Sequence, residues 1–171
     1  MARFIVDEML GNIVRWLRIL GFDTMAASSL REGAEGDIDT EIILVALREN
    51  RIIVTADTKL AERAKKLGLG IILVSPNGDT YTILKTILEI LNLHEEARRN
   101  MLTRCPICNG ILKPISREKA REIVPSRVYE NCKDFWQCTA CGKVYWIGSH
   151  FRNIDRVLHR LIGVSIWRDI S

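Results

Sequence analysis

Four cysteines in the second half of the chain form two matched pairs. Each pair has two residues between its sulfurs, and 29 residues separate the pairs. Two intervening residues allow a tight turn that points both sulfurs at one ion, and two such turns complete a tetrahedral set of four thiolates. A closed set of this kind favours zinc in a structural role. The predicted ligands are Cys105, Cys108, Cys138 and Cys141.

The same cysteines could instead form disulfides or a redox-active pair. Two matched pairs favour a metal. The first residues show no apolar stretch followed by a small-residue cleavage site, which predicts a cytoplasmic protein with reduced thiols. Gly110 and Gly142 follow the pairs and are expected to supply the positive φ that such turns often need. Cys132 lies outside the pattern and is expected to be a spare thiol.

Several aspartates stand where apolar segments end. Asp7 follows the run 4–6, and Asp57 follows the run 52–56. If these runs are neighbouring parallel strands, both carboxylates emerge at the edge where such sheets bind ligands. Clustered carboxylates repel one another unless a cation neutralises them, and oxygen ligands without histidine favour Mg²⁺ or Mn²⁺. An ion held there could activate water and stabilise charge on a phosphodiester.

Helix capping is the alternative role for these acids. Aspartate is a preferred N-cap residue, worth about 1 kcal/mol. Asp39 and Asp57 each stand just before a helical pattern, and either could merely cap it. Asp7 is harder to explain in this way, because an acid after a buried strand is costly without a partner.

The elements that must position these acids alternate between strand and helix. Apolar runs separated by helical periodicity predict an α/β fold, a Rossmann-like parallel sheet with helices on both faces. The expected strands are 3–6, 23–27, 51–55 and 70–74, the expected helices are 10–20, 39–50, 58–67 and 83–91, and 28–37 is expected to be a loop.

A boundary is predicted near residue 100, which divides the chain into an α/β unit, 1–100, and a C-terminal unit, 101–171. The second unit is expected to combine the cysteine ribbon, with an excursion over 113–133, and a basic amphipathic helix over 150–162.

Residues 1–100 carry 13 Lys and Arg against 15 Asp and Glu, and residues 101–171 carry 12 against 6. An acidic site beside a basic surface suits a polyanionic partner, although a net charge of +4 is common. No apolar run approaches the roughly 20 residues of a membrane helix.

These segments together resemble the PIN-domain nuclease superfamily. The closest resemblance is to the prokaryotic PIN-like ribonuclease family whose domain also forms the C-terminal part of animal mutator-type exonucleases. It rests on FIVDEMLG, on GDIDTEIILVALRENRIIVTADTKLAERA and on a zinc ribbon ending in VYWIGSHFRNI, across about residues 3–160. The resemblance implies a PIN-like fold and Mg²⁺- or Mn²⁺-dependent cleavage of RNA. It assigns the catalytic acids to Asp7, Asp39 and Asp57, with Asp37 as an alternative or additional ligand and Asp79 as a weak match to a fourth acid.

Basic and aromatic side chains are candidates for RNA contacts. Aromatics interleaved with cations can stack unpaired bases, but aromatics beside cysteine turns often form a small core instead. The aromatic candidates are Phe135, Trp136, Tyr145 and Trp146. The cationic candidates, each of which could equally be an ordinary solvated residue, are Arg15, Arg18, Lys59, Arg63, Lys143, Arg152 and Arg156.

The leading hypothesis is a metal-dependent endoribonuclease whose zinc ribbon aids RNA binding. The alternative is a non-catalytic RNA-binding or assembly protein on a nuclease-like fold. A small-molecule phosphohydrolase is disfavoured, because such enzymes usually place a second Asp two residues after the first-strand Asp, where this chain has Met9.

Overall fold

A parallel sheet forms the centre of the protein. The structure is a computed structural model that describes residues 1–30 and 37–166. Four strands pair in the order β2-β1-β3-β4, all parallel, which confirms the predicted α/β fold class. The strands are β1 (Arg3–Val6), β2 (Asp23–Ala26), β3 (Ile52–Thr55) and β4 (Ile71–Leu73).

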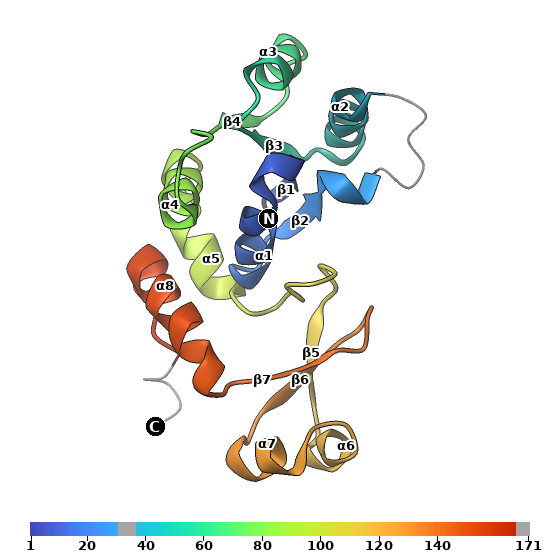
Figure 1. Ribbon diagram of the computed structural model, residues 1–171, viewed down its shortest axis with the longest axis vertical. Helices are drawn as coiled ribbons and strands as arrows, with labels where there is room; N and C mark the ends of the chain where they lie inside the picture. The colour runs from blue at the N-terminus through green and yellow to red at the C-terminus, as the bar shows by residue number, and fades with distance from the viewer. Residues whose placement is uncertain (31–36, 167–171) are drawn as a thin grey trace.

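Helices cover both faces of this sheet, because alternate side chains of each strand point to opposite sides. Phe4 and Val6 join one core with α1 and α4, whereas Ile5 and Ile53 join another with α2 and α3 (Figure 1). The helices are α1 (Gly11–Ile19), α2 (Ile38–Glu49), α3 (Thr58–Lys66), α4 (Thr80–Ile90) and α5 (His94–Asn100), and short 3₁₀ turns form η1 (Glu8–Leu10) and η2 (Ala27–Leu30).

Most predicted elements of the body are present, with two differences. The segment α5 had not been predicted. The loop expected over 28–37 is a 3₁₀ turn at its start, and its residues 31–36 lie outside the described residues.

The cysteine pairs belong to a second, antiparallel sheet. Its strands pair in the order β5-β6-β7. The predicted excursion over 113–133 is largely filled by two short helices that cover a small core with Phe135 at its centre. The elements are β5 (Leu112–Ile115), α6 (Arg117–Arg121), α7 (Ser126–Asn131), β6 (Phe135–Cys138) and β7 (Val144–Trp146).

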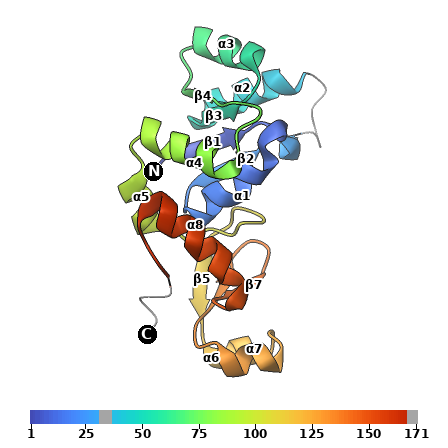
Figure 2. The same cartoon turned by 60° about the vertical axis from the view of Figure 1, so that its left-hand side comes forward.

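The chain then returns to the first part of the molecule. A 3₁₀ turn η3 (Ser149–Phe151) leads into α8 (Arg152–Ile162), which packs against α4 and α5 (Figure 2). Leu158 and Leu161 are buried in the same core as Phe4. The helix expected in the C-terminal unit therefore completes the core of the body, and the segment that stands apart is the ribbon between α5 and α8. No helix within the described ranges combines the length and apolarity needed to cross a membrane.

Candidate metal centres

Asp7 and Asp57 follow neighbouring strands and are connected through Thr55. The Thr55 hydroxyl is fully buried and donates to Oδ2 of Asp7 at 2.6 Å. The Thr55 hydroxyl oxygen also accepts a hydrogen bond from the backbone N–H of Asp57 at 2.9 Å. The backbone N–H of Asp7 donates to the Val54 carbonyl at 3.0 Å, so the pairing of β1 with β3 continues to the first acid. One buried hydroxyl therefore holds both acids at the carboxyl edge of the sheet.

The predicted cap at Asp57 is present, and it uses one carboxylate oxygen. Oδ1 accepts from the backbone N–H groups of Lys59 at 2.6 Å and Leu60 at 3.2 Å, which starts α3. Within residues 1–30 and 37–166, no hydrogen bond reaches Oδ2 of Asp57 or Oδ1 of Asp7. Capping and ion binding are therefore compatible at this edge, since each carboxylate keeps an oxygen available.

The N-cap of α2 is Asp37 rather than Asp39. Oδ1 of Asp37 accepts from the backbone N–H of Asp39 at 3.4 Å, and Oδ2 accepts from the Thr40 hydroxyl at 3.1 Å. Arg63 on α3 lies 2.9 Å from Oδ2 of Asp37 and 3.5 Å from Oδ2 of Asp39. Its hydrogen bond holds the pKa of Asp37 below the ordinary value. Arg63, a predicted RNA contact, is thus an ion-pair partner of two of the predicted acids.

The pKa of Asp39 is affected by the other acids of the predicted site. Burial raises its pKa, and the negative charges of Asp37, Asp57 and Asp7 raise it further, while Arg63 opposes them. Acids from three segments that are distant in the sequence therefore lie close enough for their negative charges to act on Asp39. Their oxygens are more widely spaced than the cysteine sulfurs, which form the one group of three or more potential ligands within 4.8 Å in the described part of the chain.

Asp79, the weak match to a fourth acid, caps a helix, and the predicted RNA contacts on α1 and α3 differ in their surroundings. Asp79 caps α4 by accepting from the backbone N–H and hydroxyl of Thr82, at 3.1 and 2.6 Å. Arg15 and Lys59 are exposed. Arg18, at the far end of α1 from Asp7, is directed elsewhere: its guanidinium donates to three backbone carbonyls, at 3.0, 3.3 and 2.6 Å, which belong to Thr24, Pro106 and Ile107. The structure therefore gives Arg18 a bracing contact and does not bring it to the acids.

The four predicted cysteines come together. Their sulfurs all lie within 4.8 Å of one another. Sγ of Cys105 is 3.8 Å from Sγ of Cys141, and Sγ of Cys108 is 3.4 Å from Sγ of Cys138. A tetrahedral zinc with bonds of about 2.3 Å would separate its sulfurs by about 3.8 Å, so this set fits a structural zinc ion. Cys132 is not in the cluster, in accord with its expected role as a spare thiol.

The surroundings of the cysteines shift the pKa of two of the thiols in opposite directions. Burial opposes ionisation of Cys105, but hydrogen bonds from Tyr145 and the backbone lower its pKa to about 7. The Tyr145 hydroxyl lies 3.0 Å from that sulfur. Burial and the neighbouring sulfurs raise the pKa of Cys108 to about 12. The surroundings therefore oppose a thiolate at Cys108, whereas a bound zinc ion would stabilise that negative charge.

The two glycines serve different purposes. Gly142 has the expected positive φ, 73°. At the first pair the positive φ, 69°, belongs to Asn109, contrary to the prediction for Gly110. Gly110 is required for a different reason, since a Cβ there would lie 2.7 Å from Sγ of Cys138.

The first cysteine turn is docked on the body at the start of β2. The Asn109 side chain accepts from the backbone N–H of Thr24 at 3.1 Å and donates to Oδ1 of Asp23 at 2.9 Å. Together with Arg18, these contacts tie the ribbon to the sheet edge opposite the acids. No sequence pattern indicated Asn109, and Tyr145 was predicted only as an aromatic contact for RNA, because the roles of both residues depend on segments that meet only in the fold.

The predicted aromatic group divides in two. Phe135 is buried in the ribbon's core, whereas Trp136 and Tyr145 line a cavity together with Lys143. Trp146 belongs to both groups, since it packs against the core and also lines the cavity. Arg152 and Arg156 are exposed on α8.

The fold and the two side-chain clusters define a class of protein: a parallel α/β domain with acids at its carboxyl edge and an attached four-cysteine ribbon. The sequence model of the Mut7-C RNAse domain family matches residues 2–158, so the chain belongs to this family. The predicted resemblance to a ribonuclease family is thereby confirmed, whereas membership of the PIN-domain superfamily stays a prediction. The family description indicates a nuclease-type role with RNA as the substrate. No curated protein and no solved structure gave a match.

Proposed function

We propose that the protein is a metal-dependent ribonuclease that hydrolyses RNA phosphodiester bonds as an endonuclease. The observation that carries this proposal is geometric: Thr55 holds Asp7 and Asp57 together at the carboxyl edge of the sheet. Asp39 lies near enough that burial first, and then the negative charges of the other acids, raise its pKa. Structural caps do not require such a cluster. Asp7 and Asp57 each retain an oxygen for a further ligand within the residues that the structure describes.

The donor set fits a hard divalent cation. Asp7, Asp39 and Asp57 would hold Mg²⁺ or Mn²⁺ through carboxylate oxygens, with Asp37 as an additional ligand. When bound, such an ion lowers the pKa of water and stabilises negative charge on the phosphate.

The chain's own residues position this chemistry. Thr55 fixes Asp7 through its buried hydroxyl, and the cap at Asp57 fixes the second carboxylate. Arg63 balances part of the negative charge around Asp37 and Asp39. Water attacks phosphorus as its proton passes to solvent, and the bond to the ribose 3′ oxygen breaks. That oxygen takes up a proton and leaves as a hydroxyl, so the phosphate stays on the 5′ oxygen.

The ribbon is proposed to bind zinc structurally and to aid RNA binding. The unit 101–171 carries the excess of positive charge. Phosphate contacts are proposed for Lys143 of the ribbon and Arg152 and Arg156 of α8, together with Arg15 and Lys59 on the body. None of the five cysteines forms a disulfide, which suits the cytoplasm as the proposed compartment.

Cleavage of a labelled circular RNA in Mn²⁺ or Mg²⁺ tests this function, because only an endonuclease can open a circle. Asp7→Asn and Asp57→Asn are each expected to reduce cleavage at least 100-fold while leaving the circular dichroism spectrum and zinc content unchanged. The matched control is Asp134→Asn, an exposed aspartate in the ribbon. Undiminished cleavage in both active-site variants would refute the proposal.

Non-catalytic RNA binding is the second candidate, and the contacts of Arg63 favour it. A guanidinium paired with Asp37 and Asp39 already supplies a positive charge where the ion would bind. RNA binding with a steep salt dependence, but no cleavage with any divalent ion, would establish this alternative.

A further inference from the structure

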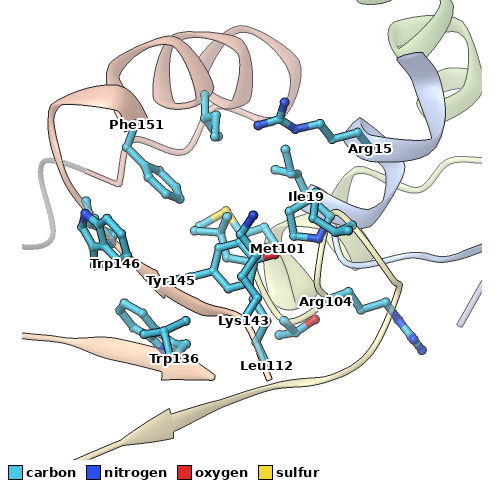
Figure 3. A pocket seen from close by; sticks show the side chains of 17 residues that line it. Arg15, Ile19, Met101, Arg104, Leu112, Trp136, Lys143, Tyr145, Trp146 and Phe151 are labelled. Carbon is cyan, nitrogen blue, oxygen red and sulfur yellow. The ribbon is translucent and has the colours of Figure 1, made fainter. Parts of the chain in front are cut away.

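A cavity of about 460 Å³ lies between the ribbon, α1 and the start of α8. Its size falls within the range of about 300–1,000 Å³ that is typical of small-ligand sites. It is separate from the acids, none of which lines it. Figure 3 shows the aromatic side chains of β6 and β7 on one wall and residues of α1 on the other.

The walls offer flat apolar surfaces. Trp136, Trp146 and Phe151 line the cavity, together with the aliphatic side chains of Ile19 and Ile154. Aromatic faces in a partly enclosed site are suited to stacking on a planar ring, and every nucleobase presents such a face.

The charge at the cavity has one sign. Arg15, Arg104 and Lys143 line it, and no acidic residue does so. Arg104 is already engaged, since it donates to the Asn109 carbonyl at 3.0 Å and lies 3.8 Å from Asp23. Arg15 and Lys143 are exposed and form no ion pair with the residues that the structure describes. In Figure 3, Arg15 extends from α1 over the cavity. The site therefore suits a ligand that combines a planar apolar ring with a negative charge.

We propose that this cavity holds one unpaired base of single-stranded RNA, with the adjoining phosphate bound by Arg15 and Lys143. This inference rests on the proposed function, for which it defines the substrate as single-stranded. A base within a duplex is stacked between its neighbours and would have to be unpaired before it entered. Arg15 lies four residues into α1, about 6 Å along the helix axis from its start, and that start follows Asp7 and η1 closely. A strand leaving the cavity along α1 would thus run towards the acids.

Binding is tested without cleavage by placing every variant in the Asp7→Asn background. Fluorescence anisotropy compares a labelled single-stranded 10-mer with the same strand annealed to its complement. The double variant Arg15→Gln/Lys143→Gln and the single variant Trp136→Leu are each expected to weaken single-strand binding about tenfold or more. The charge-matched control is Lys113→Gln/Lys133→Gln, two exposed ribbon lysines outside the cavity, and it is expected to have a smaller effect.

Tryptophan fluorescence gives a second readout that does not depend on Trp136→Leu folding. Two of the four tryptophans line the cavity, so single-stranded RNA should quench emission, and Trp136→Phe and Trp146→Phe should each reduce that quenching. Equal losses in the cavity and control variants, or quenching by an apolar peptide but not by RNA, would overturn the inference. Metal-dependent cleavage by the unsubstituted protein, together with undiminished single-strand affinity in the cavity variants, would reject the cavity alone. Single-strand binding without cleavage would reject the nuclease alone.

Discussion

Replacement of Thr55 by valine should separate the positioning of the acids from the fold that carries them. Valine keeps the branched shape of threonine and suits a buried strand, so β3 should still form. The substitution removes the 2.6 Å hydrogen bond to Asp7 and the acceptor for the Asp57 N–H. What changes first is therefore the orientation of two carboxylates.

The size of the effect can be worked out from these contacts. A hydrogen bond to a charged group contributes about 1.5–3 kcal/mol to stability, part of which the extra apolar burial of valine offsets. We expect a loss of about 2 kcal/mol, which lowers the melting temperature by about 4–8 °C for a chain of this length. A carboxylate misplaced by about 1 Å can reduce the rate about 100-fold, so kcat/KM should fall by that order.

The assay compares kcat/KM for RNA cleavage with thermal melting for Thr55→Val and Thr55→Ser. Serine retains the hydroxyl and loses only a methyl group, so it should keep activity within a few fold of the wild type. In the Asp7→Asn background, Thr55→Val should cost less activity than it does alone, because part of the hydroxyl's effect passes through the Asp7 carboxylate. The reasoning is refuted if Thr55→Val cleaves as well as Thr55→Ser, or if activity in both variants simply follows their stability.

Two further predictions concern the acidic cluster and the zinc turn. The pKa of Asp39 is raised above 3.8, so between the ordinary and the raised pKa the folded state holds a proton that the unfolded state has lost. Without divalent ions, the free energy of unfolding should therefore fall as pH rises through that window, and Mn²⁺ should restore it. Melting curves measured against pH should show neither effect in Asp39→Asn. Melting curves that Mn²⁺ leaves unchanged at neutral pH would contradict this. Gly110→Ala places a Cβ 2.7 Å from Sγ of Cys138, so a chelating dye should extract zinc faster than from Gly68→Ala. In the Gly68→Ala control the new Cβ is strained by a positive φ of 72°, but it does not contact the cysteines. Equal release of zinc from the two variants would contradict the steric argument.

The sequence identifies those features that depend on local pattern. Apolar runs place β1 and β3, and the acids that follow them lie at one edge because parallel strands share their direction. The two cysteine pairs are predictable as metal ligands because the turn that brings the two sulfurs of each pair together is local in sequence. By contrast, α5 is short and strongly charged, so periodicity gives little sign of it.

Long-range contacts explain the remaining differences. Arg18 looks like a surface cation in the sequence, because its partners Pro106 and Ile107 lie almost ninety residues later in the chain. Arg63 likewise meets Asp37 only when α2 and α3 lie together on one face of the sheet. The dual role of Thr55 is the exception, since a threonine two residues before an acid at a strand end is a local signal.

The return of α8 to the body has a consequence for how the protein is made. Leu158, Leu161 and Ile162 fill the same interior as residues from β1 and α4, so that interior stays open until translation has passed residue 162. The cysteine turns are completed by residue 141 and can take up zinc before then. On the ribosome, the ribbon should therefore fold around its metal first, and the core of the α/β body should close only after α8 has emerged.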